Sequence, residues 1–239
     1  MLAVREPERL DGGISQDGAR DDARIAAVVG HLKANPRLFT GLFFGLTLLA
    51  AGTFAVNSWA PTYFIRVFDW SPGQVGAVFG TLVVIASAGG VFAGGAIASA
   101  LMRRGVASAN MLVPMVAAGL AIPLAIAFPL MSNATTSLVV LAPMLFLSAI
   151  PFGCGSAVLP LVSPNRMRAQ MVALYLLVAN LVGFTLGPTS IGVLTDYVYG
   201  SPELIGWALA TSPPLFYLVG LLLIGWAIPR YRDLIEGNA

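Results

Sequence analysis

The chain has 239 residues, of which 57% are hydrophobic and 10% are charged, and its formal net charge is +2. A soluble domain carries roughly a quarter charged residues. Only eight charged residues lie between Leu38 and Pro229, too few to cover a water-soluble fold of that length. The composition therefore excludes a soluble enzyme, a disordered chain and a nucleic-acid-binding protein, and it predicts a membrane protein embedded in the lipid bilayer.

The first 37 residues differ from the rest, since residues 1–36 hold 11 of the 24 charged residues. They contain no apolar core typical of a signal peptide. Within them, a helical spacing of apolar residues predicts a short amphipathic helix, formed by Ile25, Val28, Val29 and Leu32. We interpret residues 1–37 as a cytoplasmic linker whose helix either lies on the membrane surface or is an ordinary linker helix.

Six apolar stretches follow, each long enough to supply the about 20 residues of a spanning helix. They are expected at about 38–64, 71–101, 110–131, 137–162, 169–194 and 204–229. Ser71 and Pro72 form a favourable start for the second helix. The six stretches are continuously hydrophobic, which excludes the alternating pattern of a transmembrane β-barrel. We therefore predict an all-α membrane protein, with a six-helix domain at 38–229 and a cytoplasmic tail at 230–239.

The basic residues indicate the orientation. With six crossings, 12 of the 13 Lys and Arg residues fall on one side, and only Arg66 falls on the other. The positive-inside rule then places both termini in the cytoplasm of a multi-pass protein of the cell (inner) membrane.

The centre of the fourth stretch carries residues that disturb a helix. Pro151 removes a backbone donor, and Gly153 and Gly155 lower helix stability further. Such a break near the bilayer midplane indicates a transporter substrate site, although a purely structural kink explains it equally well. We expect Gly153–Ser156, including Cys154 and Ser156, to face the concave side of the bundle.

The other candidate site residues are uncharged. Asn57 in the first stretch, and Tyr175 and Asn180 in the fifth, are substrate-site candidates, although such groups commonly bond a neighbouring helix. Small residues recur every fourth position in the second and fifth stretches, which predicts close helix packing, at Ala86, Gly90, Gly94, Ala98, Ala179, Gly183 and Gly187. No ionisable residue lies deep in a stretch, and the single histidine and single cysteine cannot form a metal site.

Three groups of residues together resemble the C-terminal half of a major facilitator superfamily transporter, most closely of the Spinster-like branch. They are Trp59–Arg66 with Trp70–Gly76, Gly95–Gly105, and Pro164–Arg168 with Asn180–Gly183, Gly187, Pro188 and Asp196. In the second group Gly95, Arg103 and Arg104 match the superfamily's cytoplasmic gating motif. Its acidic position is Ser99 here, so the charge interaction that this motif normally makes is not expected.

The resemblance implies a fold and a partner. Superfamily members have two six-helix halves, each an inverted 3+3 repeat, around a central cavity. The resemblance implies that the first, second, fourth and fifth helices face this cavity. Tyr63 in the first helix and Pro151 in the fourth are therefore further candidates for residues that line it. The resemblance also implies a small, amphiphilic solute, no cofactor, and pairing with an N-terminal six-helix half or with a second copy.

The expected function is solute transport by alternating access. The alternatives are a truncated, non-transporting half that needs a partner half, and a channel or permease subunit. An intramembrane enzyme is not expected, because the only histidine, His31, lies before the first stretch, only Asp196 comes near a membrane aspartate, and no HExxH motif is present.

Overall fold

The structure is a computed structural model that describes residues 30–236. The chain divides into a unit Met1–Asn35 and a unit Pro36–Ala239, and the second unit holds all the helices discussed below. The amphipathic helix predicted from Ile25 to Leu32 lies largely outside the described residues.

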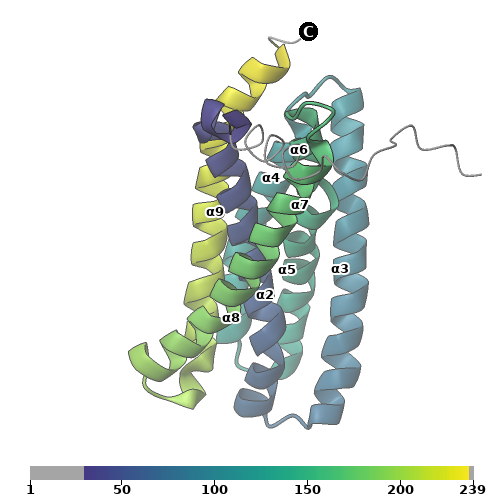
Figure 1. Cartoon of the computed structure of the whole chain (residues 1–239). Helices are drawn as coiled ribbons and strands as arrows, with labels where there is room; N and C mark the ends of the chain where they lie inside the picture. The colour runs from purple at the N-terminus through teal and green to yellow at the C-terminus, as the bar shows by residue number, and fades with distance from the viewer. Residues whose placement is uncertain (1–29, 237–239) are drawn as a thin grey trace, which may run out of the picture. The chain divides into compact units, whose positions relative to one another are not determined.

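Six apolar helical spans, each long enough to cross a membrane, form the second unit, which confirms the predicted all-α fold (Figure 1). The first three spans are α2 (Pro36–Phe68), α3 (Pro72–Arg103), and α4 (Ala109–Ala127) with the 3-10 turn η1 (Phe128–Leu130). The fourth consists of α5 (Ala134–Cys154), the 3-10 turn η2 (Gly155–Ala157) and α6 (Val158–Leu161). The last two contain α7 (Arg168–Val178), η3 (Ala179–Gly183), α8 (Phe184–Val193) and η4 (Leu194–Val198), then η5 (Pro202–Leu204) and α9 (Ile205–Glu236).

The start of α3 forms as its sequence predicts. The Gln74 N–H donates to the Ser71 hydroxyl at 3.3 Å, and the Ser71 N–H donates to the Gln74 side-chain oxygen at 3.0 Å. This capping box satisfies two backbone donors at the helix start. Just before it, Asp69 has a φ of 53°, a conformation that aspartate tolerates better than most residues.

The last helix is longer than predicted. α9 continues through Pro229 to Glu236, so residues 230–236 extend the helix instead of beginning a tail. Two contacts hold this extension to the α3–α4 loop: the Tyr231 hydroxyl donates to the Ala107 carbonyl at 3.3 Å, and Arg232 donates to the Ser108 hydroxyl at 3.4 Å.

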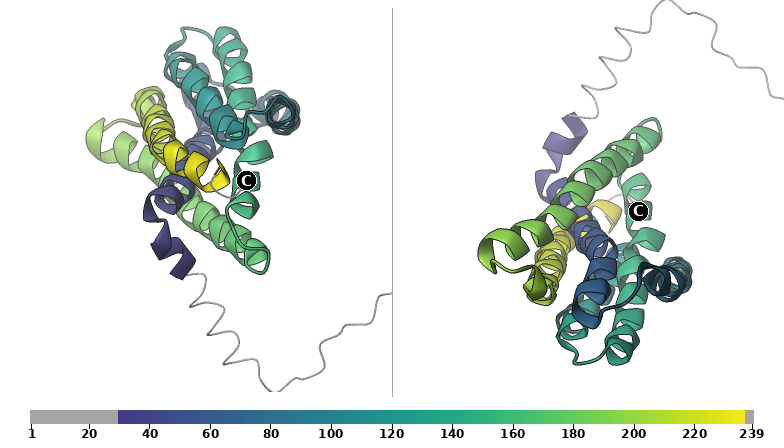
Figure 2. Two further views of the ribbon diagram at one scale, coloured as in Figure 1. Left: turned by 90° about the horizontal axis from the view of Figure 1, so that it is seen from above. Right: turned by 90° about the horizontal axis from the view of Figure 1, so that it is seen from below.

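The helix contacts follow an internal symmetry (Figure 2). α2 packs on α8 and α9, while α5 packs correspondingly on α3 and α4, and α4 packs on α9. Exchanging the first three spans with the last three maps the α2–α8 pair onto α5–α3 and the α2–α9 pair onto α5–α4, and it maps the α4–α9 pair onto itself. Because α2 begins at the end of the bundle where α5 and α6 finish, the two repeats are inverted (Figure 1).

Glycines allow α3 to approach α5 closely. A Cβ atom at Gly94 would lie 2.5 Å from the Ile150 carbonyl oxygen, and one at Gly90 would overlap the Phe146 carbonyl. From the other helix, a Cβ at Gly153 would overlap the Val91 carbonyl. The small residues of α3 therefore serve packing, as their spacing predicts.

The symmetry-related contact of α8 with α2 also depends on glycines that let the two backbones approach closely. A Cβ at Gly187 would overlap the Ala51 carbonyl, and one at Gly183 would lie 3.3 Å from the Thr47 carbonyl oxygen. The indole N–H of Trp59 donates to the Pro188 carbonyl at 2.8 Å and adds a polar link between the same helices.

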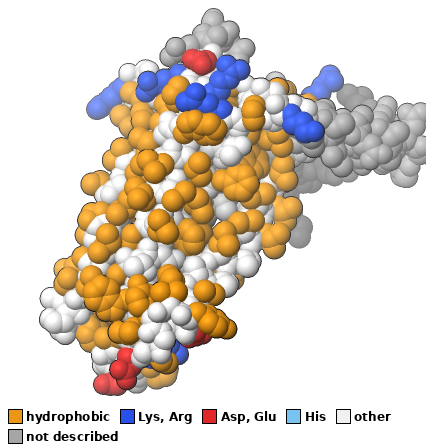
Figure 3. All heavy atoms as spheres, turned by 90° about the vertical axis from the view of Figure 1, so that its left-hand side faces the viewer, with side chains coloured by type: hydrophobic (Ala, Val, Ile, Leu, Met, Phe, Trp, Pro, Cys, Tyr) orange, Lys and Arg blue, Asp and Glu red, His pale blue; other side chains and the backbone are white. Residues whose placement is uncertain are grey.

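The charged side chains lie at the two ends of the bundle, and most of the basic ones lie at one end. Alternating helix directions bring these basic residues to one end: Arg37, Arg103, Arg104, Arg166, Arg168, Arg230 and Arg232. On the face shown in Figure 3, Lys and Arg gather at that end, and the surface between the two ends is predominantly apolar. This distribution matches a multi-pass integral membrane protein.

The glycine contact predicts a position-specific effect on stability. Gly94→Ala should destabilise the fold by about 1–3 kcal/mol, because its methyl group meets backbone that cannot move aside. Gly80→Ala, on the same helix, is the matched control, since a Cβ there has no heavy atom within 4 Å. Thermal unfolding of both variants in detergent measures the difference, and an equal midpoint for the two would contradict the packing.

Candidate substrate site

The fourth span is broken one turn beyond the proline that predicted the break. The α-helical conformation ends at Cys154, whose φ of −136° leaves the helical region, and the 3-10 turn η2 follows at once. Pro151 itself stays within α5, and its carbonyl accepts the Gly155 N–H. The break therefore lies among the glycines that follow the proline.

The fifth span is irregular in a stretch for which we predicted a continuous helix. The segment η3, Ala179–Gly183, is π-helical and contains Asn180, and a second π-helical segment forms η4. Single-turn π-helical segments within α-helices frequently mark functional sites. Ala179 and Asn180 of η3 line the same pocket as Pro151, Phe152 and Ser156 of the fourth span.

One pocket of about 230 Å³ lies between the two irregular segments and α2. We call it the central pocket, and its lining residues are Ala50, Phe54, Pro151, Phe152, Ser156, Tyr175, Leu176, Ala179 and Asn180. Four of the predicted site residues meet here although they come from different spans: Pro151, Ser156, Tyr175 and Asn180.

The polar groups of the central pocket have unused hydrogen-bonding capacity. The Asn180 amide nitrogen donates to the Leu176 carbonyl at 2.8 Å, which leaves its oxygen and second N–H open. Neither the Tyr175 hydroxyl nor the Ser156 hydroxyl has a hydrogen-bond partner within residues 30–236. The Tyr175 ring is held edge-on against Phe43, with centroids 6.0 Å apart. The pocket thus offers three polar groups on an otherwise apolar wall.

An aromatic wall, not foreseen from the sequence, borders the pocket. The ring of Phe54 lies 6.1 Å from that of Phe152 and 5.4 Å from that of Phe184. Phe152 and Phe184 remain 44% and 61% exposed. The three phenylalanines come from α2, α5 and α8, so only the folded chain brings them together.

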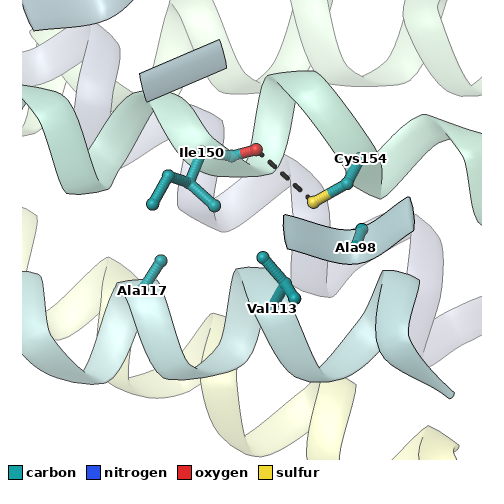
Figure 4. Packing of buried hydrophobic residues seen from close by; sticks show 5 residues of the cluster. All are labelled: Ala98, Val113, Ala117, Ile150 and Cys154. Atoms are coloured by element: carbon teal, nitrogen blue, oxygen red, sulfur yellow. Dashed lines mark hydrogen bonds between the residues drawn. The ribbon is translucent and has the colours of Figure 1, made fainter. Parts of the chain in front are cut away.

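Cys154 does not face the central pocket, contrary to our expectation for Gly153–Ser156. It is buried against Ala98 of α3 and Val113 of α4, and its thiol donates to the Ile150 carbonyl at 3.5 Å (Figure 4). Cys154 and Ser156 project from different sides of the span, because consecutive helical residues are rotated by roughly 100°.

Tyr63 and Asn57 also lie outside the central pocket. Tyr63 is fully buried toward the other end of α2, where its hydroxyl donates to the Pro129 carbonyl at 3.2 Å and its ring packs on Phe64 and Phe128. Asn57 lies about one turn beyond Phe54, and its side-chain oxygen is buried without a hydrogen-bond partner among the described residues.

A buried polar group stabilises the core behind the pocket. Thr53 donates to the Leu49 carbonyl at 3.1 Å, and its hydroxyl lies 3.4 Å from that of Tyr217. Tyr217 is 1% exposed, its contact with Thr53 joins α2 to α9, and neither residue is among those that line the pocket.

The three gating-motif residues lie away from the central pocket. Gly95 sits in the α3–α5 contact, where a Cβ would lie 3.4 Å from the Gly153 carbonyl oxygen. Arg103 and Arg104 are exposed at the end of α3, at the basic end of the bundle. Their role in gating stays a prediction.

The lining residues define what the central pocket can do. It contains no charged residue, and the described part of the chain holds no cluster of three His, Cys, Asp or Glu that could bind a metal. Its chemistry is that of a binding site for a largely apolar molecule with hydrogen-bonding groups.

Comparison with known proteins identifies relatives at the level of family and fold. The family model of the Major Facilitator Superfamily matches residues 1–188. No curated protein sequence matches the chain.

Two solved structures share the fold. Both are of a bacterial homolog to the human lysosomal transporter Spinster, inward-facing and either unoccupied or occupied. The unoccupied structure matches with a TM-score of 0.66 at 18% sequence identity, over 95% of this chain and 53% of its own length. The occupied structure matches with a TM-score of 0.63 at 19% sequence identity, over 86% of this chain and 50% of its own length. The chain thus spans about half the length of these structures.

The opposite placement of two neighbouring residues predicts different thiol reactivity. In a Cys154→Ala chain that also carries Ser156→Cys, the introduced thiol should react readily with a small maleimide in detergent. The thiol of Cys154 in the unmodified chain should react more slowly, by roughly tenfold or more, because a buried thiol reacts only when the structure opens locally. Mass spectrometry over time measures both rates, and the denatured chains provide the matched control. Equal rates in the folded proteins would contradict the assignment of Ser156 to the central pocket.

Proposed function

The chain belongs to the major facilitator superfamily, and on that premise we propose that it forms one half of a transporter for a small, amphiphilic solute. The superfamily and the fold support transport across a membrane. The solute class and the pairing of two halves are inferred from the site.

The central pocket is the observation that supports this proposal. Tyr175, Asn180 and Ser156 offer hydrogen bonds to a head group, while Phe54, Phe152 and Leu176 offer apolar contact to its remainder. A strongly charged solute is disfavoured, since a charge desolvated without a partner costs far more than an uncharged polar group.

The size and exposure of the site favour a second half. A volume of about 230 Å³ is below the roughly 300–1,000 Å³ of pockets that enclose a drug-sized ligand. The aromatic wall of Phe54, Phe152 and Phe184 next to this pocket is not covered by the chain, since the Phe152 and Phe184 side chains remain exposed. An N-terminal six-helix half, or a second copy of this chain, would supply the opposite wall, and rocking of the two units would give alternating access.

We further propose that both termini of the chain are cytoplasmic and that it resides in the cell (inner) membrane. The exposed arginines at one end of the bundle support this orientation, because cytoplasmic loops carry an excess of Lys and Arg.

Binding by the central pocket should depend on its hydrogen bonds. Tyr175→Phe and Asn180→Leu should each weaken binding of a neutral or zwitterionic single-chain amphiphile by about 1 kcal/mol, or roughly fivefold. Equilibrium binding of a fluorescent amphiphile to the chain in nanodiscs measures this. Tyr197→Phe is the matched control, because Tyr197 is 85% exposed on η4 and does not line the pocket.

Two outcomes would count against the proposal. Unchanged affinity in both pocket variants would show that the solute binds elsewhere. Saturable uptake into liposomes by the chain alone, with no dimer present, would show that a second half is not needed.

The orientation predicts a labelling pattern. Single cysteines introduced into the Cys154→Ala chain at Asn133 or Tyr199 should react with a membrane-impermeant maleimide added outside intact cells. Cysteines at Arg104 or Asn165 should react only after the cells are opened, because these loops lie at the basic end. The reverse pattern would overturn the orientation.

A further inference from the structure

A second pocket, of about 310 Å³, lies on a different face of α5 from the central pocket. We call it the lateral groove; it lies between α3 and α4, and α5 forms its floor. Its ten lining residues are all apolar: Ile97, Leu101, Leu112, Val113, Val116, Ala117, Leu120, Phe146, Leu147 and Ile150. Figure 4 shows Val113, Ala117 and Ile150 of this lining side by side.

The lateral groove opens outward along its length. Ile97, Val116 and Leu120 are 45%, 56% and 56% exposed, whereas Val113 and Ala117 on the inner side of α4 and Ile150 on α5 are 7%, 3% and 4% exposed. Along α4 the lining extends from Leu112 to Leu120, about 12 Å at the helical rise. The groove is thus an elongated apolar slot within the membrane-spanning segments, suited to a hydrocarbon chain.

The groove ends next to a concentration of positive charge. Leu101 lies within about 5 Å, along the α3 axis, of Arg103 and Arg104. Both arginines are exposed, and neither has an ion-pair partner within residues 30–236. Ser99 stands one turn before Arg103, and the segment 99–112 contains no acidic residue. Arg232, bonded to Ser108, adds a third positive charge at the same end.

We propose that the lateral groove is a binding site for an anionic phospholipid. One acyl chain lies in the slot formed by α3, α4 and α5, and the phosphate contacts Arg103 and Arg104. The arginine fork binds phosphate with two parallel hydrogen bonds, and the apolar lining has no polar atom that a hydrocarbon chain would leave unsatisfied. Bound in this way, the lipid links the α3–α4 loop to the core beneath it.

The test is a competition between two lipids with identical acyl chains. The full chain is freed of lipid in detergent, mixed with equal amounts of phosphatidylglycerol and phosphatidylcholine, and examined by native mass spectrometry. Each arginine near a lipid head group is worth about 1 kcal/mol, so phosphatidylglycerol should be preferred by on the order of 20-fold.

Three variants separate the groove from general surface charge. Arg103→Gln with Arg104→Gln should abolish the preference, whereas Arg103→Lys with Arg104→Lys should keep most of it. The matched control is Arg166→Gln with Arg168→Gln. These arginines lie at the same end of the bundle but away from the groove, since Arg166 precedes α7 and Arg168 is its first residue. This variant should keep the full preference for phosphatidylglycerol.

The acyl-chain site is tested separately. Val116→Trp should fill the slot and reduce retention of both lipids, while Leu222→Trp, which is equally apolar and 59% exposed on α9, should not. Free glycerol phosphate should not compete at the same concentration. Equal retention of both lipids by the unmodified chain, or equal loss of preference in the two arginine-to-glutamine pairs, would overturn the proposal.

Discussion

The structure depends on close approach of helix backbones at glycine. Lipid solvates apolar side chains as well as another helix does, so association of spans relies on van der Waals contact and on polar links between helices. Gly90 and Gly94 let α3 approach the α5 backbone, and Gly187 lets α8 approach that of α2. Because these two contacts correspond under the internal symmetry, they position both repeats. Each pairs a sparsely buried span with one of the more buried ones, α5 or α2.

The rotation set by these contacts decides what α5 presents on each side. Gly153 faces α3, so Cys154 turns into the core while Phe152 and Ser156 turn toward α7 and η3. Irregular backbone within a membrane is tolerated where it is buried in protein or lines a cavity. The break at Cys154 and the π-helical segment η3 satisfy this condition, since Cys154 is buried within the protein and Ala179 and Asn180 of η3 line the central pocket.

The two pockets assign different chemistry to the two sides of α5. The central pocket combines polar groups that have unused hydrogen-bonding capacity with an aromatic wall, whereas the lining of the lateral groove is wholly apolar and ends near arginines. Arg103 and Arg104 have no ion-pair partner within residues 30–236, and the segment 99–112, which begins with Ser99, contains no acidic residue. This unpaired positive charge supports the anionic phospholipid site proposed above.

The sequence by itself determined the features that depend on local composition. The six spans, the Ser71 cap, the small-residue faces of α3 and α8 and the gathering of arginines at one end follow from hydrophobic length, side-chain size and charge along the chain. It also indicated four residues of the central pocket, because polar side chains and helix breakers are rare within a span. Only the tertiary structure decided that Tyr175, Asn180 and Ser156 meet while Cys154, Tyr63 and Asn57 lie elsewhere. The orientation of each residue depends on the rotation of its helix, and that rotation is set by contacts with helices far away in the sequence.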